Sequence, residues 1–120
     1  MPTQPQPLTL SQAARRAAEA VDPDGGDDRI ADFATRFEDR DEPIRSLTET
    51  IEEEVAEVVG ALDLEGDDPA LAMAGAVVTY LAFRRDEVTL DDGRLLELAA
   101  DAEFKGDPPP HVAAWLAGQD

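Results

Sequence analysis

The apolar and polar positions of the chain follow a helical period wherever they are regular, and no segment shows the alternation of a half-buried strand. Residues 70–83 stand out because fourteen consecutive residues, Ala-Leu-Ala-Met-Ala-Gly-Ala-Val-Val-Thr-Tyr-Leu-Ala-Phe, carry no charge. A helix that is apolar on every face is normally buried. We therefore expect a central helix over about residues 69–85 with the others packed around it. The segment is too short to span a bilayer, which needs roughly 20 apolar residues.

Three helices are predicted before the central one. Thr9 and Gln12 have the spacing of a capping box, and Asp27 or Asp28 can cap the second helix after an Asp-Pro-Asp-Gly-Gly turn. The third helix covers about residues 43–62 and is the most strongly amphipathic. The residues expected to face the core are Leu10, Ala13, Ala14, Ala17, Ala18 and Val21 in the first helix, Ile30, Phe33, Ala34 and Phe37 in the second, and Ile44, Leu47, Ile51, Val55, Val58, Val59 and Leu62 in the third.

Two helices are predicted after the central one. The first begins at Asp91 or Asp92, after an extended link over residues 88–90, and ends at Gly106. A short last helix follows the prolines at 108–110. Their inward residues are expected to be Leu95, Leu96, Ala99 and Ala102, then Val112, Trp115 and Leu116. The sequence therefore predicts an all-α fold, with a disordered Pro-rich tail over residues 1–8 and a single compact domain of five to six helices over residues 9–118.

The charge of the chain is strongly negative and uneven. Twenty-eight Asp and Glu residues against ten Lys and Arg give a net charge of −18, and residues 22–68 alone carry 18 acids and four bases. Such a surface repels nucleic acid and anionic membranes, so direct binding to either is excluded. High-salt adaptation and a GC-rich genome both explain the composition. The functional alternative is an acidic mimic of nucleic acid that occupies a basic site on another protein.

The sequence also indicates the cellular compartment of the protein. Because the chain has no cysteine, disulfides and thiolate metal sites are excluded. The sequence shows neither an N-terminal signal segment nor a membrane-spanning stretch. We therefore expect a cytoplasmic protein.

Glu53, Glu54 and Glu57 form the most suggestive chemical pattern. Read as Glu-Glu-x-x-Glu on a helix, they resemble half of the magnesium motif of the all-α nucleoside triphosphate pyrophosphatases similar to MazG. The resemblance implies a divalent-metal phosphohydrolase whose carboxylates meet an acidic pair on the next helix. Here the next predicted helix has no acid between Ala70 and Phe83. Glutamates on the solvent face of an amphipathic helix are therefore the preferred interpretation.

Two further polar features were candidates for metal sites. Asp22, Asp24, Asp27 and Asp28 are dense in carboxylates, but the register of an EF-hand calcium loop fails at three positions, which favours a turn and a helix cap. His111 is the only histidine, and a lone histidine does not make a histidine-based metal site. The sequence therefore assigns no catalytic, cofactor-binding or metal-ligating residue, and no cofactor.

The functional prediction is accordingly a small acidic protein that binds other proteins and is not an enzyme. An acidic helical surface suits a basic partner, because electrostatics sets the association rate and the specificity of such contacts. The partner is another protein or a second copy of this chain, since a central helix left uncovered on one face would form a dimer interface. The metal-dependent phosphohydrolase with Glu53, Glu54 and Glu57 is the enzymatic alternative.

Overall fold

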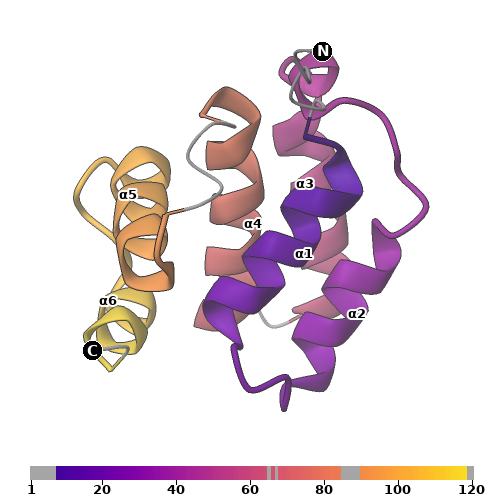
Figure 1. The fold of residues 1–120 in the computed structure, drawn as a ribbon. Helices are drawn as coiled ribbons and strands as arrows, with labels where there is room; N and C mark the ends of the chain where they lie inside the picture. Colours follow the sequence, from indigo (N-terminus) through magenta and orange to yellow (C-terminus); the bar gives the residue numbers. More distant parts are fainter. Residues whose placement is uncertain (1–7, 65, 67, 85–89, 119–120) are drawn as a thin grey trace.

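A central helix, α4 (Pro69–Phe83), lies between α5 and α6 on one side and α1, α2 and α3 on the other (Figure 1). The computed structural model describes residues 8–64, 66, 68–84 and 90–118. Over these residues the chain forms six α-helices, one 3-10 helix and no strand. The all-α fold predicted from the apolar pattern is therefore confirmed.

The central helix begins and is buried largely as its sequence predicts. The carboxylate of Asp68 accepts a hydrogen bond from the backbone N–H of Leu71 at 3.2 Å, and Pro69 occupies the first helical position. Its most extensive contacts are with α1 and α5, followed by α3. The helix ends at Phe83 with Arg84 as its C-cap. Arg85, the last residue of the predicted range, lies outside the described residues.

The helices α1 (Leu10–Val21) and α2 (Asp28–Arg36) pack side by side. The predicted capping box is present, with reciprocal hydrogen bonds between Thr9 and Gln12. The predicted stripe of α1 is buried except Ala18, which is partly buried. Phe33 of α2 and Phe37, the residue that caps the end of α2, are fully enclosed and meet edge to face, with ring centroids 5.2 Å apart. The first two predicted core faces are therefore largely confirmed.

The predicted third helix over residues 43–62 is not continuous, which corrects the sequence-based boundary. Residues Ile44–Leu47 form a 3-10 helix, η1, and α3 begins only at Ile51 and ends at Leu62. Between them the N–H of Thr50 bonds to the carbonyl of Leu47 at 2.9 Å. At the other end, the N–H of Ile44 bonds to the carbonyl of Leu8 at 2.8 Å. This tie to the start of α1 and the weak helix propensity of the threonines at 48 and 50 account for the break.

Two of the helix–helix connections share one turn design. Asp22 ends α1 and Asp63 ends α3, and each carboxylate accepts hydrogen bonds from two backbone N–H groups of the turn that follows. Five residues later a second aspartate, Asp27 or Asp68, caps the next helix. A glycine with positive φ stands three residues after each first aspartate. The bonds join Gly26 and Asp27 to Asp22 at 3.3 and 2.8 Å, and Gly66 and Asp68 to Asp63 at 3.0 and 3.0 Å.

The helices α5 (Asp92–Phe104) and α6 (Pro110–Ala117) complete the bundle. Arg16 of α1 holds the start of α5, because its guanidinium lies 2.7 Å from an oxygen of Asp92 and donates to the carbonyl of Leu90 at 2.6 Å. Lys105 ends α5 in the left-handed conformation. Of the predicted link over 88–90, residues 88 and 89 lie outside the described residues. In α6, Val112 is buried and the predicted Trp115 and Leu116 are partly buried against the core.

At the ends of the chain, residues 1–7 of the predicted tail lie outside the described residues, and Leu8 packs against the core. Among the helices that the structure describes, none is long and apolar enough to cross a membrane.

Candidate binding groove

Three residues that the apolar pattern assigned to the core are accessible, and all three border one hollow. Phe83, at the end of the charge-free run, is 55% exposed. Ala102 of α5 is also exposed, and Val59 of α3 is only partly buried. The prediction that Phe83 and Ala102 face the core is therefore wrong. Both residues instead line space beside α4 that no element of the described chain fills.

This hollow is a groove of about 600 Å³ between α3, α4 and the end of α5. A second hollow of about 280 Å³ continues it toward Phe83 and Arg84. The two share five lining residues, so they form one surface feature, which we call the α4 groove. Its floor consists of Ala72, Gly75, Ala76 and Thr79 of α4, and its walls include Glu52, Val55, Ala56 and Val59 of α3 and Ala102, Glu103, Phe104 and Lys105 from the end of α5.

The depth of the groove follows from the residues of its floor. Ala72, Gly75, Ala76 and Thr79 are small and recur three or four positions apart, so they share one face of α4. On its α3 side this face is closely covered, because a methyl carbon built on Gly75 would stand 2.8 Å from Cγ1 of Val55. Of these floor residues Ala76 is only 3% exposed and Thr79 9%, so the accessible apolar surface of the groove lies mainly on Val59, Ala102 and Phe83. Apolar floors with a few polar groups at the rim are typical of binding sites.

Two carboxylates, Glu52 of α3 and Glu103 of α5, line both parts of the groove. Desolvation in the groove raises the pKa of Glu103, and the negative charge of Glu52 raises it further. Both side chains remain exposed to solvent, and neither forms a hydrogen bond or ion pair with another described residue. The pair therefore repels across the groove, and a cation placed between the two carboxylates would remove that repulsion.

The three candidate metal ligands of α3 do not form one group that could hold a metal ion. Glu53 and Glu57 are exposed, whereas Glu54 turns toward Arg40 and forms an ion pair of 2.7 Å. Arg40 also pairs with Glu42 at 2.7 Å, and this contact lowers the pKa of Glu42. Of these three glutamates, none lines the α4 groove. The geometry thus places Glu54 in a structural ion-pair network rather than in a set of ligands.

The aspartates after α1 act as the turn and cap that the sequence indicates. Asp22 accepts the turn N–H groups, and Asp27 accepts the N–H groups of Arg29 and Ile30 at the start of α2. Asp24 and Asp28 are exposed, as is His111 at the start of α6. Within the described part of the chain, no three His, Asp or Glu side chains are grouped so that they could hold a metal ion.

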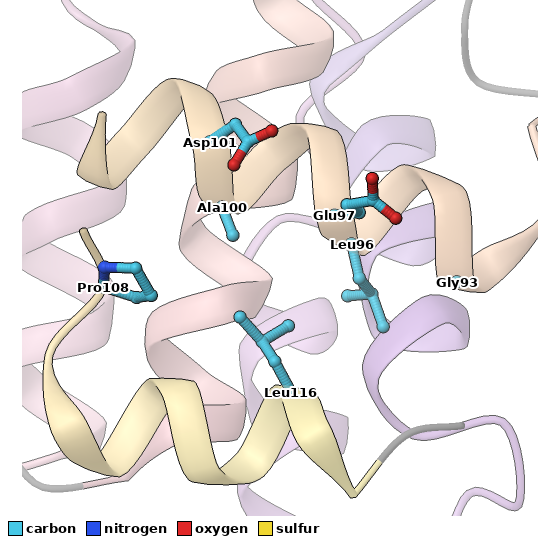
Figure 2. Close-up of a pocket in the computed structure, with 7 residues that line it drawn as sticks. All are labelled: Gly93, Leu96, Glu97, Ala100, Asp101, Pro108 and Leu116. Atoms are coloured by element: carbon cyan, nitrogen blue, oxygen red, sulfur yellow. The ribbon is translucent and has the colours of Figure 1, made fainter. Parts of the chain in front are cut away.

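A smaller hollow of about 200 Å³ lies between α5 and α6. Figure 2 shows Leu96 and Ala100 of α5 and Leu116 of α6 pointing toward one another across it, with Pro108 at one end. This hollow is smaller than the α4 groove, and Glu97, one of its two carboxylates, is already paired with Arg94 at 3.0 Å.

The comparisons with known proteins give no family for this chain. No protein-family model matches it, and neither the curated proteins nor the solved structures include a match. The chemistry of the α4 groove is therefore the basis for a functional proposal. Sequence reasoning missed Glu103 as a groove residue, because no local pattern signals that it meets Glu52 from another helix.

Proposed function

We propose that this protein is a non-enzymatic interaction module that binds a basic segment of another protein in the α4 groove. The observation that carries the proposal is that two exposed apolar residues, Ala102 and Phe83, share one groove with two like-charged carboxylates, Glu52 and Glu103. The carboxylates have no partner among the described residues. Apolar contact with Ala102 and Phe83 would supply affinity, and the carboxylates would select a cationic group.

The net charge supports a basic partner over a second copy of this chain. Each copy carries −18, so two copies repel, whereas a cationic protein is attracted over the range of the Debye length. The same field speeds the encounter with a basic surface. A cytoplasmic location is also part of the proposal. It rests on the sequence features described above.

Two other functions require different arrangements of the carboxylates. A metal-dependent phosphohydrolase needs Glu53, Glu54 and Glu57 to converge, whereas Glu54 pairs with Arg40. A mimic of nucleic acid needs rows of carboxylates spaced like phosphates, and its partner would be displaced by DNA. Neither function requires an apolar groove.

The test is site-specific photo-crosslinking in extract of the source cells. A photoreactive amino acid is placed at Ala102, which is exposed and lines the groove, or at the control position Ala113, which is exposed on α6 and lines none of the hollows described above. We expect one basic protein to be captured from Ala102 and not from Ala113, with the yield reduced by added salt. Glu52→Gln should reduce the yield further.

Three results would contradict the proposal. Equal capture of the same proteins from Ala102 and Ala113 would mean that the charged surface acts without the groove. No capture from Ala102 above background would mean that the groove has no protein partner. Loss of the captured protein on addition of DNA fragments would support the nucleic-acid mimic instead.

A further inference from the structure

We infer that the outer face of α6 is a contact surface for a second copy of this chain, so that two copies form a weak dimer through their α6 helices. This surface is separate from the α4 groove, because no residue of α6 lines that groove. The inference therefore does not rest on the proposed function. It follows from the lack of charge on α6, the exposure of its side chains and its position in the fold.

The segment from Pro108 to Gly118 contains no Asp, Glu, Lys or Arg, in a chain of which 32% of the residues are charged. The other charge-free helix is α4, and the remaining helices cover it on almost every face. This is the usual state of a helix that is apolar all round, because such a helix has no side that favours water.

The described chain does not cover α6 in the same way. Of the residues in this helix only Val112 is buried, while Trp115 and Leu116 are partly buried against the core. The residues Ala113, Ala114 and Ala117 are exposed. Figure 1 shows α6 at the edge of the bundle, where it packs on α4 with one side only. The helix thus has the composition of a covered element on an exposed surface, which indicates that another molecule covers it.

The chemistry of this face favours a second copy over a basic partner. A cationic segment is recognised by carboxylates, and α6 has none. An uncharged face instead requires an uncharged partner face, because a charged side chain would lose its hydration there without gaining a counter-charge. Among the described helices, α6 itself presents such a face, since α4 is buried and each of the other four exposes Asp, Glu or Arg. A two-fold axis brings identical surfaces together, so α6 can be its own partner.

The position of α6 also limits the repulsion between two copies. Residues 22–68 carry 18 of the 28 acidic residues, and their helices, α2 and α3, lie on the far side of α4 from α6 (Figure 1). Two copies joined at α6 therefore keep their most acidic parts apart. The remaining repulsion acts over the Debye length, which falls from about 30 Å at 0.01 M salt to about 3 Å at 1 M. Added salt should therefore favour the dimer, whereas it weakens binding of a basic partner in the groove.

The contact is expected to be weak, because α6 is short. The helix Pro110–Ala117 has eight residues, which rise roughly 12 Å at 1.5 Å per residue. A standard interface buries about 800 Å² on each partner, which is more than one face of such a helix provides. We therefore expect a dimer that dissociates on dilution.

Sedimentation equilibrium of the full chain, at several protein concentrations in low and in high potassium chloride, measures this dimer. We expect a monomer–dimer equilibrium whose dissociation constant falls at high salt. Ala114→Glu places a carboxylate of each copy at the contact and should raise the dissociation constant by roughly tenfold or more. Ala31→Glu is the matched control, because it makes the same substitution at an exposed alanine of α2. It should change the constant by less than about twofold, and melting curves check that both variants are folded.

A second measurement uses the lack of cysteine in the chain. Ala114→Cys introduces a single thiol, and a two-fold contact at α6 brings the thiols of two copies near each other. Mild oxidation at high salt should then give a disulfide-linked dimer of Ala114→Cys, and much less of one with Ala31→Cys.

The outcomes separate this inference from the proposed function. A monomer at every concentration and salt would overturn the dimer and leave the groove proposal untouched, because that proposal is tested by crosslinking from Ala102. Equal losses with Ala114→Glu and Ala31→Glu, or equal disulfide yields, would show that the copies do not meet at α6. A dimer that dissociates on addition of salt would be held by opposite charges, which α6 lacks, and would also exclude this contact. A salt-favoured dimer without any capture from Ala102 would support the dimer and end the proposed function.

Discussion

Val55 of α3 packs directly over Gly75 of α4, so closely that a methyl carbon added to the glycine would stand 2.8 Å from Cγ1 of the valine and 3.1 Å from Cγ2 of Val59. The absence of a side chain at Gly75 thus lets the two helices meet at the edge of the groove. Glycine inside a helix costs about 1 kcal/mol relative to alanine. Close packing of α3 is the physical reason that this cost is tolerated.

The first prediction follows from that contact. Gly75→Ala should lower the free energy of unfolding by about 1 kcal/mol, because overpacking costs roughly 1–3 kcal/mol and exceeds the gain in helix propensity. Gly60→Ala is the matched control, since nothing lies within 4 Å of a methyl carbon at this exposed position of α3. It should raise stability by up to about 1 kcal/mol. Urea unfolding followed by circular dichroism measures both, and equal gains would refute the tight contact.

The second prediction concerns the turn between α3 and α4. Asp63 is only 8% exposed, and its carboxylate accepts two backbone N–H groups. Asp63→Ala leaves these donors unsatisfied and should reduce stability by about 2 kcal/mol or more. Asp22→Ala, in the more exposed turn after α1, should have a smaller effect, and Asp24→Ala should change stability by less than ~0.5 kcal/mol. Thermal melts of the three variants test this order, and a loss with Asp24→Ala equal to that with Asp63→Ala would contradict it.

The third prediction is a pH dependence caused by Glu103. Its pKa in the folded protein is raised above the ordinary value of 4.5, so the folded state binds the proton more tightly than the unfolded state. Stability therefore falls as the pH rises from 4.5 through the raised pKa, and the ionised carboxylate weakens the fold at neutral pH. Glu103→Gln should raise the melting temperature at neutral pH, with the difference vanishing below pH 4.5.

Two further variants control this measurement. Asp101→Asn removes the same charge from the same helix outside the groove, so it should raise the melting temperature less than Glu103→Gln does. Glu42 has the opposite behaviour, because Arg40 lowers its pKa and its contribution is lost as the pH falls below 4.5. Glu42→Gln should therefore weaken the fold at neutral pH and not in acid. The same pH profile for Glu103→Gln and Asp101→Asn would show that net charge alone is responsible.

The fourth prediction distinguishes diffuse acidity from a metal site. With a net charge of −18, the melting temperature should rise with potassium chloride, and magnesium at matched ionic strength should do no more. A specific site filled at ~100 times its dissociation constant would add about 2.7 kcal/mol. Stabilisation by submillimolar magnesium far beyond matched salt, lost in Glu53→Gln, would revive the phosphohydrolase. The test is a pair of thermal titrations.

The features that the sequence predicts correctly are those determined by residues within one helix and its cap. The Thr9–Gln12 capping box, the alanine stripe of α1 and the phenylalanine pair of Phe33 and Phe37 each depend on residues a few positions apart. The break before Ile51 was missed because it depends on the tie between Ile44 and Leu8. Such a contact between distant residues leaves no trace in the period of the pattern.

The candidate site was beyond sequence reasoning for a related physical reason. An apolar period shows which face of a helix avoids water, but it does not show whether a neighbouring helix covers the whole of that face. At Phe83 and Ala102 no neighbour does, and the groove results. Likewise, Glu52 and Glu103 come together only because α3 and α5 flank the same face of α4. Predicting that pair requires the relative placement of three helices.

The placement of α4 also has a consequence for synthesis of the chain. The buried stripe of α1 lies mainly against α4, whose residues are made 48 or more positions after α1 ends. At roughly 5–20 residues per second, the alanines of α1 remain without the helix that covers them for a time on the order of seconds. A nascent chain that stalls before Pro69 lacks its core, and it would be a substrate for proteases rather than a smaller version of this fold.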